Sequence, residues 1–570
     1  MGPTAESTTQ QVNPMTTSER LGSKTYSMKY VFRKMTWRLF WAWMVTALIN
    51  VIFGYEVTSF GGVQSIPAFA KQFGQKTASG KYELSSERAS YTASLAFVGK
   101  LVGSLMAPFG IERFGHRWTI WALVVIVWIG VVIESTSKEI AQFIIGRIVI
   151  YFRCCYSHGV RPRHDASHGT QLTLLLPKSS VGLAEVTSTS YQSEISPAAM
   201  RGTIVGSLQL FIQIGQIYAA GVNRAYSTST HPSGWIIPVA IQAGVPSIVF
   251  VCNFFIPDSP RWLISKDRKE DAVKVLDIVR PAEDVRSGVN RLEVDAIEEA
   301  VRNDLEKAPW IELIRGVNLR RTLIGSGLLG LQQFLGQNLV SGYSPRFYAT
   351  VGLSKEAFNY NIGSATVGWA GSLLGILLSD FLGRRDVLIW GAVIQSAFLF
   401  LITGVGLQSN PTTTDARALV AGVMLYFFFY SGTWGPLLFT VCSEAGNPAL
   451  REKTLSLGVA LNVITAFIVS FSVPYILDAI GSAIGAVFGG IAFFSAILVY
   501  FVLPETKDRS LEELDELFKA HVPARKFKTT RTYGAGSRVT DLENASYNEK
   551  LDRPTVEHEE RVETINLQDV

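Results

Sequence analysis

About twelve apolar runs, each close to 20 residues long, divide this chain, and they constrain its fold more than any other feature of the sequence. A helix needs about 20 apolar residues to cross the hydrocarbon core of a bilayer. We therefore predict an all-α membrane protein with about twelve transmembrane helices in two pseudo-symmetric six-helix bundles. The expected spans are residues 39–62, 89–110, 117–136, 140–152, 200–222, 234–256, 322–345, 359–380, 386–407, 417–442, 453–477 and 482–503.

The composition agrees with a membrane protein, because 48% of the 570 residues are hydrophobic and only 17% are charged. The net charge of +5 is small for this length, and the sequence has no basic patch with interleaved aromatic residues, so nucleic acid is not an expected partner. The sequence contains no nucleophile–base motif, phosphate loop or ordered metal-ligand spacing. We therefore expect neither an enzyme nor a cofactor or a metal site.

Basic residues indicate the orientation of the chain. Lys and Arg crowd both ends, the central polar segment and the loops after the second and eighth spans, which share one side if there are twelve spans. Such residues favour the cytosol, so we expect both termini there. The expected domains are a cytosolic N-terminus (1–38), a first bundle (39–256), a cytosolic helical linker (257–321) with amphipathic helices at 260–279 and 286–306, a second bundle (322–503) and a cytosolic tail (504–570) that is mostly disordered after a short SLEELDELF helix.

A charged motif occurs at matching places in the two halves. The segments 111–117 and 379–385 each contain a carboxylate, a glycine three residues later and then a basic residue pair, and an acid and an arginine recur seven residues apart further on. This repetition indicates an internal duplication. Acid–base clusters at helix ends can lock two bundles together and release them, although the same charges could only set topology. The gate candidates are Glu112, Arg113, Arg117, Glu194, Arg201, Asp380, Arg384, Arg385, Glu444 and Arg451, with Glu505 beside them.

Polar amides interrupt two of the apolar spans. Gln209, Gln213 and Gln216 are spaced i, i+4 and i+7, so they share one helix face, which must point away from lipid. A second cluster lies in residues 326–343, where unpaired amides in hydrocarbon would each cost several kcal/mol. There the helix either unwinds near Gly336 or uses some amides to bind neighbouring helices. We predict a polar-lined cavity in which amides replace the water shell of a neutral, hydroxyl-rich solute.

Two ionisable residues inside spans are candidates for ion coupling. Glu56 lies about eight residues from the outer end of the first span, and Arg147 about seven from the outer start of the fourth. At ~1.5 Å per residue the two lie at a similar depth, which allows an ion pair. A change in that pairing could load or release a proton. The alternative is a static clamp in a passive facilitator.

One stretch, residues 153–180, does not fit a transmembrane helix. It follows Phe152, about halfway through the fourth span, and contains several Arg, His and Lys residues and an Asp. Each Arg or Asp at that depth would cost about 2.5–3.5 kcal/mol. The histidines and the cysteine pair are too irregularly spaced for a typical metal site. We hypothesise that this insert is translated from an unremoved intron, because its deletion leaves a continuous apolar helix.

The chain resembles the sugar porter family of the major facilitator superfamily, in its fungal form. The matching motifs are FGYE (53–56), ERFGHR (112–117), GR (146–147), EISPAAMRG (194–202), PDSPRWL (257–263), QQFLGQN (332–338), DFLGRR (380–385), WGP (434–436) and PETK (504–507). The sequence departs from the family at Glu56, where proton-linked members commonly have Asp, and at His116, where Arg is usual. The resemblance implies that Gln209, Gln332, Gln333 and Asn338 bind sugar hydroxyls, that Trp434 forms a stacking or gating wall, and that Asn462 is a further ligand.

These features lead us to expect transport of a small-molecule sugar by alternating access, with proton symport. The alternatives are a passive sugar facilitator and a transporter-like nutrient sensor. We expect a monomer in the lipid bilayer, at the plasma membrane. Amides bind hexoses, pentoses, disaccharides and polyols alike, so the sequence leaves the choice of sugar open.

Overall fold

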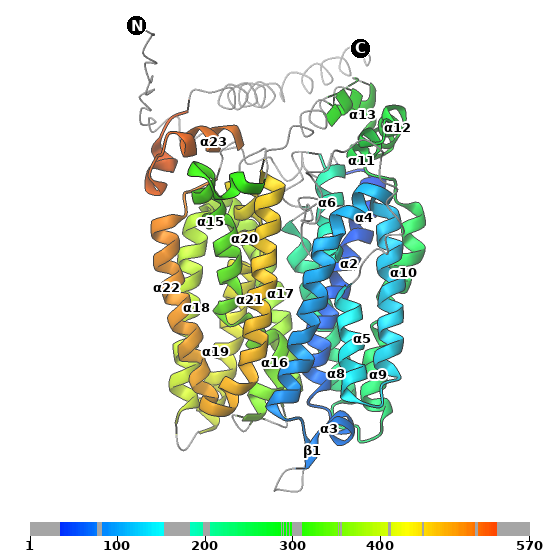
Figure 1. Cartoon of the computed structure of the whole chain (residues 1–570). Helices are drawn as coiled ribbons and strands as arrows, with labels where there is room; N and C mark the ends of the chain where they lie inside the picture. The colour runs from blue at the N-terminus through cyan, green and yellow to red at the C-terminus, as the bar shows by residue number, and fades with distance from the viewer. Residues whose placement is uncertain are drawn as a thin grey trace, which may run out of the picture.

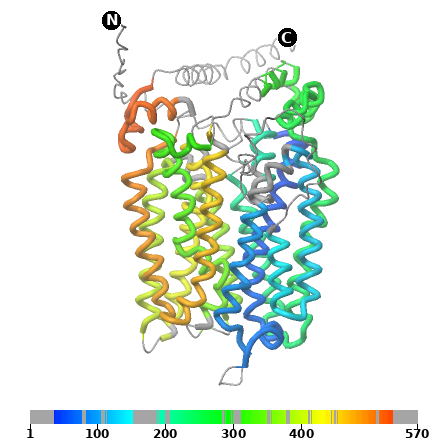
Figure 2. Tube along the Cα trace, in the orientation of Figure 1, coloured from blue at the N-terminus to red at the C-terminus, as the bar shows by residue number. Residues whose placement is uncertain are grey.

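The computed structural model describes residues 35–532 except for residues 77–81, 153–182, 198–203, 205, 287, 289, 292, 296, 299–309, 351–352, 354–355, 409–411, 447–449 and 508–510. The predicted insert at 153–180 and most of the predicted terminal segments therefore lie outside the described residues. Two bundles of long helices stand side by side (Figure 1), one built from the first half of the chain and the other from the second half. The trace in Figure 2 shows the same division, with blue, cyan and blue-green segments on one side and bright green, yellow and orange segments on the other.

The N-terminal bundle begins with a long helix most of whose residues are buried. Its helices are α2 (Trp37–Val63), α4 (Ser86–Ser135), α5 (Ile140–Phe152), α6 (Leu183–Ile195), α8 (Leu208–Tyr226), α9 (Ser233–Ile241) and α10 (Gly244–Cys252), followed by η2 (Asn253–Phe255). Helix α4 contains two of the predicted spans, which are joined at Gly115, where φ is +80°. Glycine adopts this left-handed conformation without the strain of a Cβ, so the chain can reverse there without a long loop.

The C-terminal bundle is built from a similar series of helices. Its helices are α15 (Gly316–Leu331), η5 (Gln332–Leu335), α16 (Gln337–Thr350), α17 (Ala357–Leu382), α18 (Arg384–Gly406), α19 (Thr413–Gly432), α20 (Trp434–Ala445), α21 (Arg451–Ile480), η6 (Gly481–Ala483) and α22 (Ile484–Val502). When α4 is counted as two passes and the divided helices as one each, the described helices make six passes per bundle. The predicted twelve-helix fold is confirmed.

Six helical segments of the described chain are long and apolar enough to cross a membrane, and their burial differs with position in the bundle. The best window of Trp37–Val63 is 61% buried, whereas that of Ser233–Phe255 is 33% buried. Helix α2 is therefore interior, and α9 with α10 forms a peripheral, lipid-facing pass. An interior helix can carry polar side chains, because they face protein rather than hydrocarbon.

Short elements mark the two ends of the bundles. One end, which we call the linker end, carries α11 (Pro260–Ser265), α12 (Lys269–Val279), α13 (Ala282–Arg286), η4 (Trp310–Ile314), α23 (Leu511–Lys519) and η7 (Ala524–Thr529) (Figure 1). The far end carries α3 (Pro67–Phe73) and a two-stranded antiparallel ribbon, β1 (Gln75–Lys76) and β2 (Tyr82–Glu83), in which Gln75 pairs with Glu83.

Each bundle has its own cover at the linker end. Arg280, after α12, donates to the carbonyl of Ile195 at the end of α6 (2.7 Å) and pairs with Glu293 at 2.6 Å, which fixes the linker to the N-terminal bundle. Arg321 of α15 pairs with Asp515, which fixes α23 to the C-terminal bundle. The linker and the tail therefore dock on different bundles.

The structure differs from several of the expected boundaries, and three of the differences concern the linker, the fifth span and the tail. The expected helix at 260–279 is divided into α11 and α12, because the chain turns at Asp267, where φ is +59°. The fifth span extends to Tyr226, beyond the apolar pattern, since the amide of Asn223 donates to carbonyls of α2. The described part of the tail reaches Thr532 and contains a second short helix, η7, in which Phe527 is fully buried.

Candidate functional site

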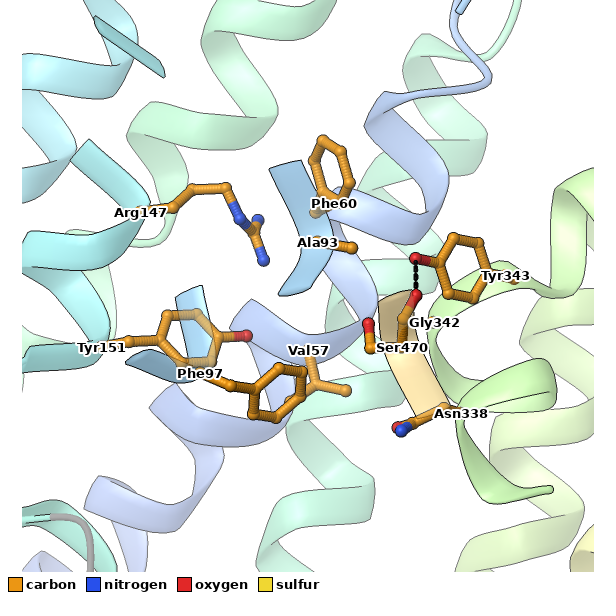
Figure 3. Close-up of a pocket in the computed structure, with 10 residues that line it drawn as sticks. All are labelled: Val57, Phe60, Ala93, Phe97, Arg147, Tyr151, Asn338, Gly342, Tyr343 and Ser470. Carbon is orange, nitrogen blue, oxygen red and sulfur yellow. Dashed lines mark hydrogen bonds between the residues drawn. The ribbon is translucent and has the colours of Figure 1, made fainter. Parts of the chain in front are cut away.

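A pocket lies where the two bundles meet. Helices α2, α4 and α5 line one side, and α16 and α21 line the other (Figure 3). Figure 3 shows Arg147 and Tyr151 on the N-terminal side facing Asn338 on the C-terminal side. The Tyr343 hydroxyl donates to the carbonyl of Ser470 at 2.9 Å, which holds α16 against α21 at the pocket wall. The lining residues are Val57, Phe60, Ala93, Phe97, Arg147, Tyr151, Asn338, Gly342, Tyr343 and Ser470.

The far end of the bundle interface is closed by polar contacts between the bundles. Asp478 of α21 accepts hydrogen bonds from Ser86 of α4 and, at 3.1 Å, from Arg346 of α16. Arg346 also donates to the Ser86 hydroxyl at 2.9 Å. A little deeper, the Ser90 hydroxyl donates to the carbonyl of Phe471 at 2.7 Å. These bonds join α4 to the C-terminal bundle on the far-end side of the pocket.

Two glycines bring α2 and α16 into backbone contact in the same region. A Cβ built on Gly61 would lie 2.4 Å from the carbonyl oxygen of Gly342, which is far closer than an ordinary contact. The absence of side chains therefore allows the two helices to meet. The amide of Gln64 adds a long hydrogen bond of 3.4 Å to the same carbonyl.

The repeated charged motif forms one cluster in each bundle at the linker end. In the N-terminal bundle, Nε2 of His116 lies 3.8 Å from the carboxylate of Glu194, which also accepts bonds from Ser190 (3.0 Å) and Ser259. In the C-terminal bundle, Arg384 lies 3.6 Å from Glu444. The two pairs occupy equivalent places, and each pair joins helices of its own bundle.

Three of the remaining gate candidates bind backbone groups near helix ends. The carboxylate of Glu505 accepts from the backbone N–H groups of Arg384 (3.0 Å) and Arg385 (3.2 Å), so it caps the start of α18. Arg385 donates to the Tyr500 carbonyl at 2.7 Å, and Arg117 donates to the Phe254 carbonyl at 3.2 Å. The guanidinium of Arg113 lies 5.6 Å from the ring of Phe114. Arg201 and the side chains of Glu112, Asp380 and Arg451 lie outside the described residues.

The predicted unwinding near Gly336 is present. Helix α15 ends at Leu331, a 3-10 turn spans Gln332–Leu335, and Gly336 has φ of +94°. Neighbouring tyrosines bind groups at the break: Tyr426 donates to the Leu335 carbonyl at 2.7 Å, and Tyr430 donates to the Gln337 amide oxygen at 2.8 Å. The break therefore turns several amides toward different neighbours.

Three of the predicted sugar ligands bind one another or the backbone. The amide nitrogen of Gln332 donates to the carbonyls of Trp434 (2.7 Å) and Gly435 (3.0 Å), and its oxygen accepts from Asn462 at 3.0 Å. Gln333 donates to the oxygen of Asn462 at 3.1 Å. Both alternatives for this cluster therefore apply, because the helix unwinds and some amides bind neighbouring helices.

The fifth-span amides are all buried and face the other bundle. Gln213 donates to the hydroxyl of Ser431 in α19 at 2.9 Å, and the amide of Gln209 lies beside Gly435 of α20. Among the described residues, the amide oxygen of Gln213 and the amide nitrogens of Gln216 and Asn338 have no hydrogen-bond partner. Polar atoms of this kind at the bundle interface are available to a polar solute.

Trp434 lies deep in the C-terminal bundle. Its side chain is fully buried, and its indole N–H donates to the carbonyl of Leu388 in α18 at 2.9 Å. In this conformation its ring packs in the core, which is the alternative to a stacking wall. Its backbone carbonyl holds Gln332, so its position still affects the amide cluster.

The two coupling candidates are both buried in the N-terminal bundle, and one of them packs on aromatic rings. The guanidinium of Arg147 lies 4.4 Å from the centre of the Phe60 ring and 5.5 Å from that of Tyr151. Equal depth along two helices does not fix which way each side chain turns, and the ring faces attract the cation. The pairing of Arg147 with Glu56 therefore stays a prediction.

Two further buried charges were not singled out from the sequence. Lys100 of α4 lies over the ring of Phe53 at 4.2 Å, and Glu134 of α4 accepts a bond from Gln242 at 2.7 Å. The signal that marked Glu56, an ionisable residue within an apolar run, applies equally to both. The N-terminal bundle thus buries acids and bases together.

Comparison with known proteins identifies the family to which this chain is similar. The model of the family described as "Sugar (and other) transporter" matches residues 42–162 and 179–518, and the gap between these parts falls inside the predicted insert. The general alpha-glucoside permease of Saccharomyces cerevisiae (strain S288c) is 25% identical over 525 residues, which cover 89% of this chain and 79% of that protein. The low-affinity glucose transporter HXT4 of Saccharomyces cerevisiae (strain JAY291) is 27% identical over 493 residues, which cover 84% of this chain and 80% of that protein.

Among solved structures, the proton:xylose symporter XylE bound to 6-bromo-6-deoxy-D-glucose has a TM-score of 0.66 and 23% identity, and the match covers 84% of this chain and 99% of that chain. The xylose transporter XylE from E. coli in an inward-open conformation has a TM-score of 0.65 and 21% identity, with 84% and 99% covered. The relatives are transporters, which confirms that the chain is not an enzyme. The family match and the two six-pass bundles show that this chain is a multi-pass membrane protein of the sugar (and other) transporter family, with the major facilitator fold.

Proposed function

We propose that this protein carries a sugar across the plasma membrane by alternating access, coupled to the movement of a proton. The observation that carries the proposal is the set of buried amides at the bundle interface whose polar atoms have no partner among the described residues. Among the predicted sugar-facing amides they belong to Gln213, Gln216 and Asn338. A buried, unpaired amide costs about 1–3 kcal/mol. A sugar hydroxyl, which both donates and accepts, offsets that cost for the amide oxygen and the amide nitrogen alike.

The distribution of contacts supports alternating access. Bonds between the bundles close the far end around Asp478, whereas the His116–Glu194 and Arg384–Glu444 pairs act within their own bundles. A rocking motion that opens the far end must break the Asp478 contacts and separate Gly61 from Gly342. We infer that the linker end, with its basic loops and helices, faces the cytosol and that the structure is closed to the outside. Both termini are then cytosolic.

Charges in the N-terminal bundle support proton coupling. Ionisable residues in a transmembrane bundle are expensive and often mark ion pathways. Glu56 is buried at the depth of the pocket, since Val57 of the same turn lines it, and Arg147 lines the pocket itself. A carboxylate there can take a proton when the pocket is open to the outside and release it to the cytosol. Arg147 lies over aromatic rings in this conformation, so its guanidinium can move between partners.

The binding site is tested by uptake of radiolabelled glucose, maltose and xylose into yeast cells that lack their own sugar transporters. Gln213→Leu and Asn338→Leu keep the side-chain volume but remove the amide. Each should raise the KM of the transported sugar roughly fivefold, which corresponds to about 1 kcal/mol for one hydrogen bond. Gln395→Leu is the matched control, because Gln395 is also a buried amide with an oxygen that has no partner among the described residues, but its nitrogen donates to Thr433 within the C-terminal bundle rather than across the interface.

Proton coupling is tested in the same cells with a protonophore and at several external pH values. A symporter loses accumulation when the protonophore is added. Uptake that ignores the protonophore would favour the passive facilitator. An absence of uptake for all sugars, with the protein at the plasma membrane and nutrient signalling intact, would favour the sensor and refute the transport proposal. Each assay uses the chain with and without residues 153–180.

A further inference from the structure

Glu134 is a second buried carboxylate of the N-terminal bundle, at the far end of α4. Its side chain is 3% exposed. It accepts a hydrogen bond of 2.7 Å from the amide of Gln242, which follows α9. A Cβ built on Gly146 would lie 2.6 Å from the Cγ of Glu134, so the acid packs directly on α5, one residue before Arg147. Three helices therefore enclose this carboxylate.

The charges that act on Glu134 come from the two residues assigned to proton coupling. Arg147 attracts its carboxylate and Glu56 repels it. The other neighbouring elements present neutral groups: Gln242 follows α9, and the amide of Gln72 in α3 donates to the carbonyl of Ser137, just beyond α4. Lys138 and Glu139, also beyond α4, are exposed, and another buried cation, Lys100, lies over Phe53 in the first half of α4.

Glu134 and Arg147 lie at a similar depth. A Cβ built on Gly146 would also lie 2.9 Å from the backbone nitrogen of Glu134 and 3.2 Å from its Cα, and Arg147 is the next residue of α5. The guanidinium of Arg147 packs on aromatic rings and lines the pocket. Glu134 therefore lies between the far end of α5 and the pocket, beside the residue that precedes Arg147.

We propose that Glu134 is a second proton site beside Arg147, which binds a proton from the outside water and thereby directs Arg147 toward Glu56. This inference rests on the proton coupling proposed above. When Glu134 is ionised, it competes with Glu56 for the one guanidinium. When a proton from the outside water forms an O–H bond with the Glu134 carboxylate, the attraction to Arg147 is lost, and Glu56 keeps the cation. Gln242 holds the carboxyl group in place in both states, because an oxygen remains to accept its N–H.

Glu134→Gln tests the proposal, because it keeps the size of the side chain and removes the titration. Accumulation of labelled sugar should fall at least tenfold, and its dependence on external pH should flatten. Exchange of labelled for unlabelled sugar at equal concentrations, which needs no net proton movement, should stay within about twofold of the wild-type rate. Glu139→Gln is the matched control, since it removes an exposed acid five residues further along and should leave both measurements unchanged.

Infrared difference spectra of the purified protein, recorded between acidic and neutral pH, provide a direct readout. The wild type should show a carboxylic-acid band that depends on pH. This band should be absent from Glu134→Gln and present in Glu139→Gln. This inference alone would be overturned if the wild type is proton-coupled and Glu134→Gln accumulates sugar as the wild type does. It would also be overturned if Glu134→Gln loses both exchange and accumulation while its amount at the cell surface is normal, because that result indicates a structural role. Wild-type uptake that ignores the protonophore would overturn the proposed symport and this inference together.

Discussion

Gly61→Ala should prevent the far end from closing, and its effect can be worked out from one contact. The new Cβ would lie 2.4 Å from the Gly342 carbonyl oxygen and 2.9 Å from its carbon, whereas ordinary contacts begin at 3.4 Å. The methyl group is therefore about 1 Å too close to a backbone that cannot rotate away. Alanine forms helix better than glycine by about 1 kcal/mol, so α2 itself is not weakened. The strain falls on the contact between the bundles.

The strain acts only on the conformation that is closed at the far end. Overpacking of this kind costs about 1–3 kcal/mol. If the open conformation relieves all of it, the equilibrium shifts toward the open form by roughly 5–150-fold. Loss of the weak Gln64 bond to the same carbonyl, 3.4 Å long, adds little. The protein should become trapped with its pocket open to the outside, and its net uptake should fall accordingly.

Labelling of an introduced cysteine measures this shift. Ala93→Cys places a thiol in the pocket lining, deeper in the interface than the far-end contacts. A membrane-impermeant maleimide added outside reaches this thiol only when the far end opens. Gly61→Ala should speed labelling by the factor above. Gly342→Ala is the control, because its Cβ would meet nothing within 4 Å. Equal labelling rates in Gly61→Ala and the parent, or equally fast labelling in Gly342→Ala, would refute the reasoning.

Three further changes test other parts of the structure. Gly336→Ala should lower the free energy of unfolding by about 1–2 kcal/mol, because φ is +94° there, whereas Gly327→Ala, in open space, should not; thermal unfolding of the purified proteins compares them. Asp515→Asn should cost about 1–3 kcal/mol and release α23 to proteolysis, since it leaves the buried Arg321 without its counter-charge. Burial raises the pKa of Asp515, but hydrogen bonds from two cations outweigh it and lower the pKa, so this docking should be complete above about pH 4 and be lost as the pH falls further. Deletion of residues 153–180 should raise the amount of folded protein and its uptake, and sequencing of the spliced transcript checks whether the insert is encoded in the mature message.

The sequence predicts the number and order of the passes because bilayer thickness fixes the length of an apolar helix. It does not show that the two helices within α4 meet directly at Gly115, where a single glycine with positive φ makes the reversal that a loop was expected to make. It also does not show the turn at Asp267 that divides the linker helix, because the amphipathic pattern continues across it. The periodicity of apolar residues indicates which residues face inward. The backbone angle at a single residue does not change this periodicity, so the sequence pattern does not reveal such a turn.

The sequence predicts which helix faces are polar, but it does not predict which of their side chains bind one another. Helical spacing placed Gln213 on an inward face, and the structure buries it against the other bundle. The sequence could not show that Gln332 and Asn462 bind each other, because that contact joins residues 130 positions apart. The Glu56–Arg147 pair stays a prediction for a related reason. Depth along two helices can be counted, whereas the competition of aromatic rings and of Glu134 for the same guanidinium depends on packing.

The two halves of the protein repeat one acid–base pair, and the way each acid is held bears on how the bundles move. Arg384 and Glu444 are about one-fifth exposed and 3.6 Å apart, so the attraction between them is worth about 0–1 kcal/mol and is screened by salt. Both acids also accept short hydrogen bonds from hydroxyl groups: Glu444 from Thr506 at 2.6 Å, and Glu194 from Ser190 at 3.0 Å and from Ser259. These bonds act at short range and, like the acid–base pairs, join parts of one bundle. We therefore expect each linker-end cluster to stay intact while the bundles rock, so that each bundle moves as a rigid body.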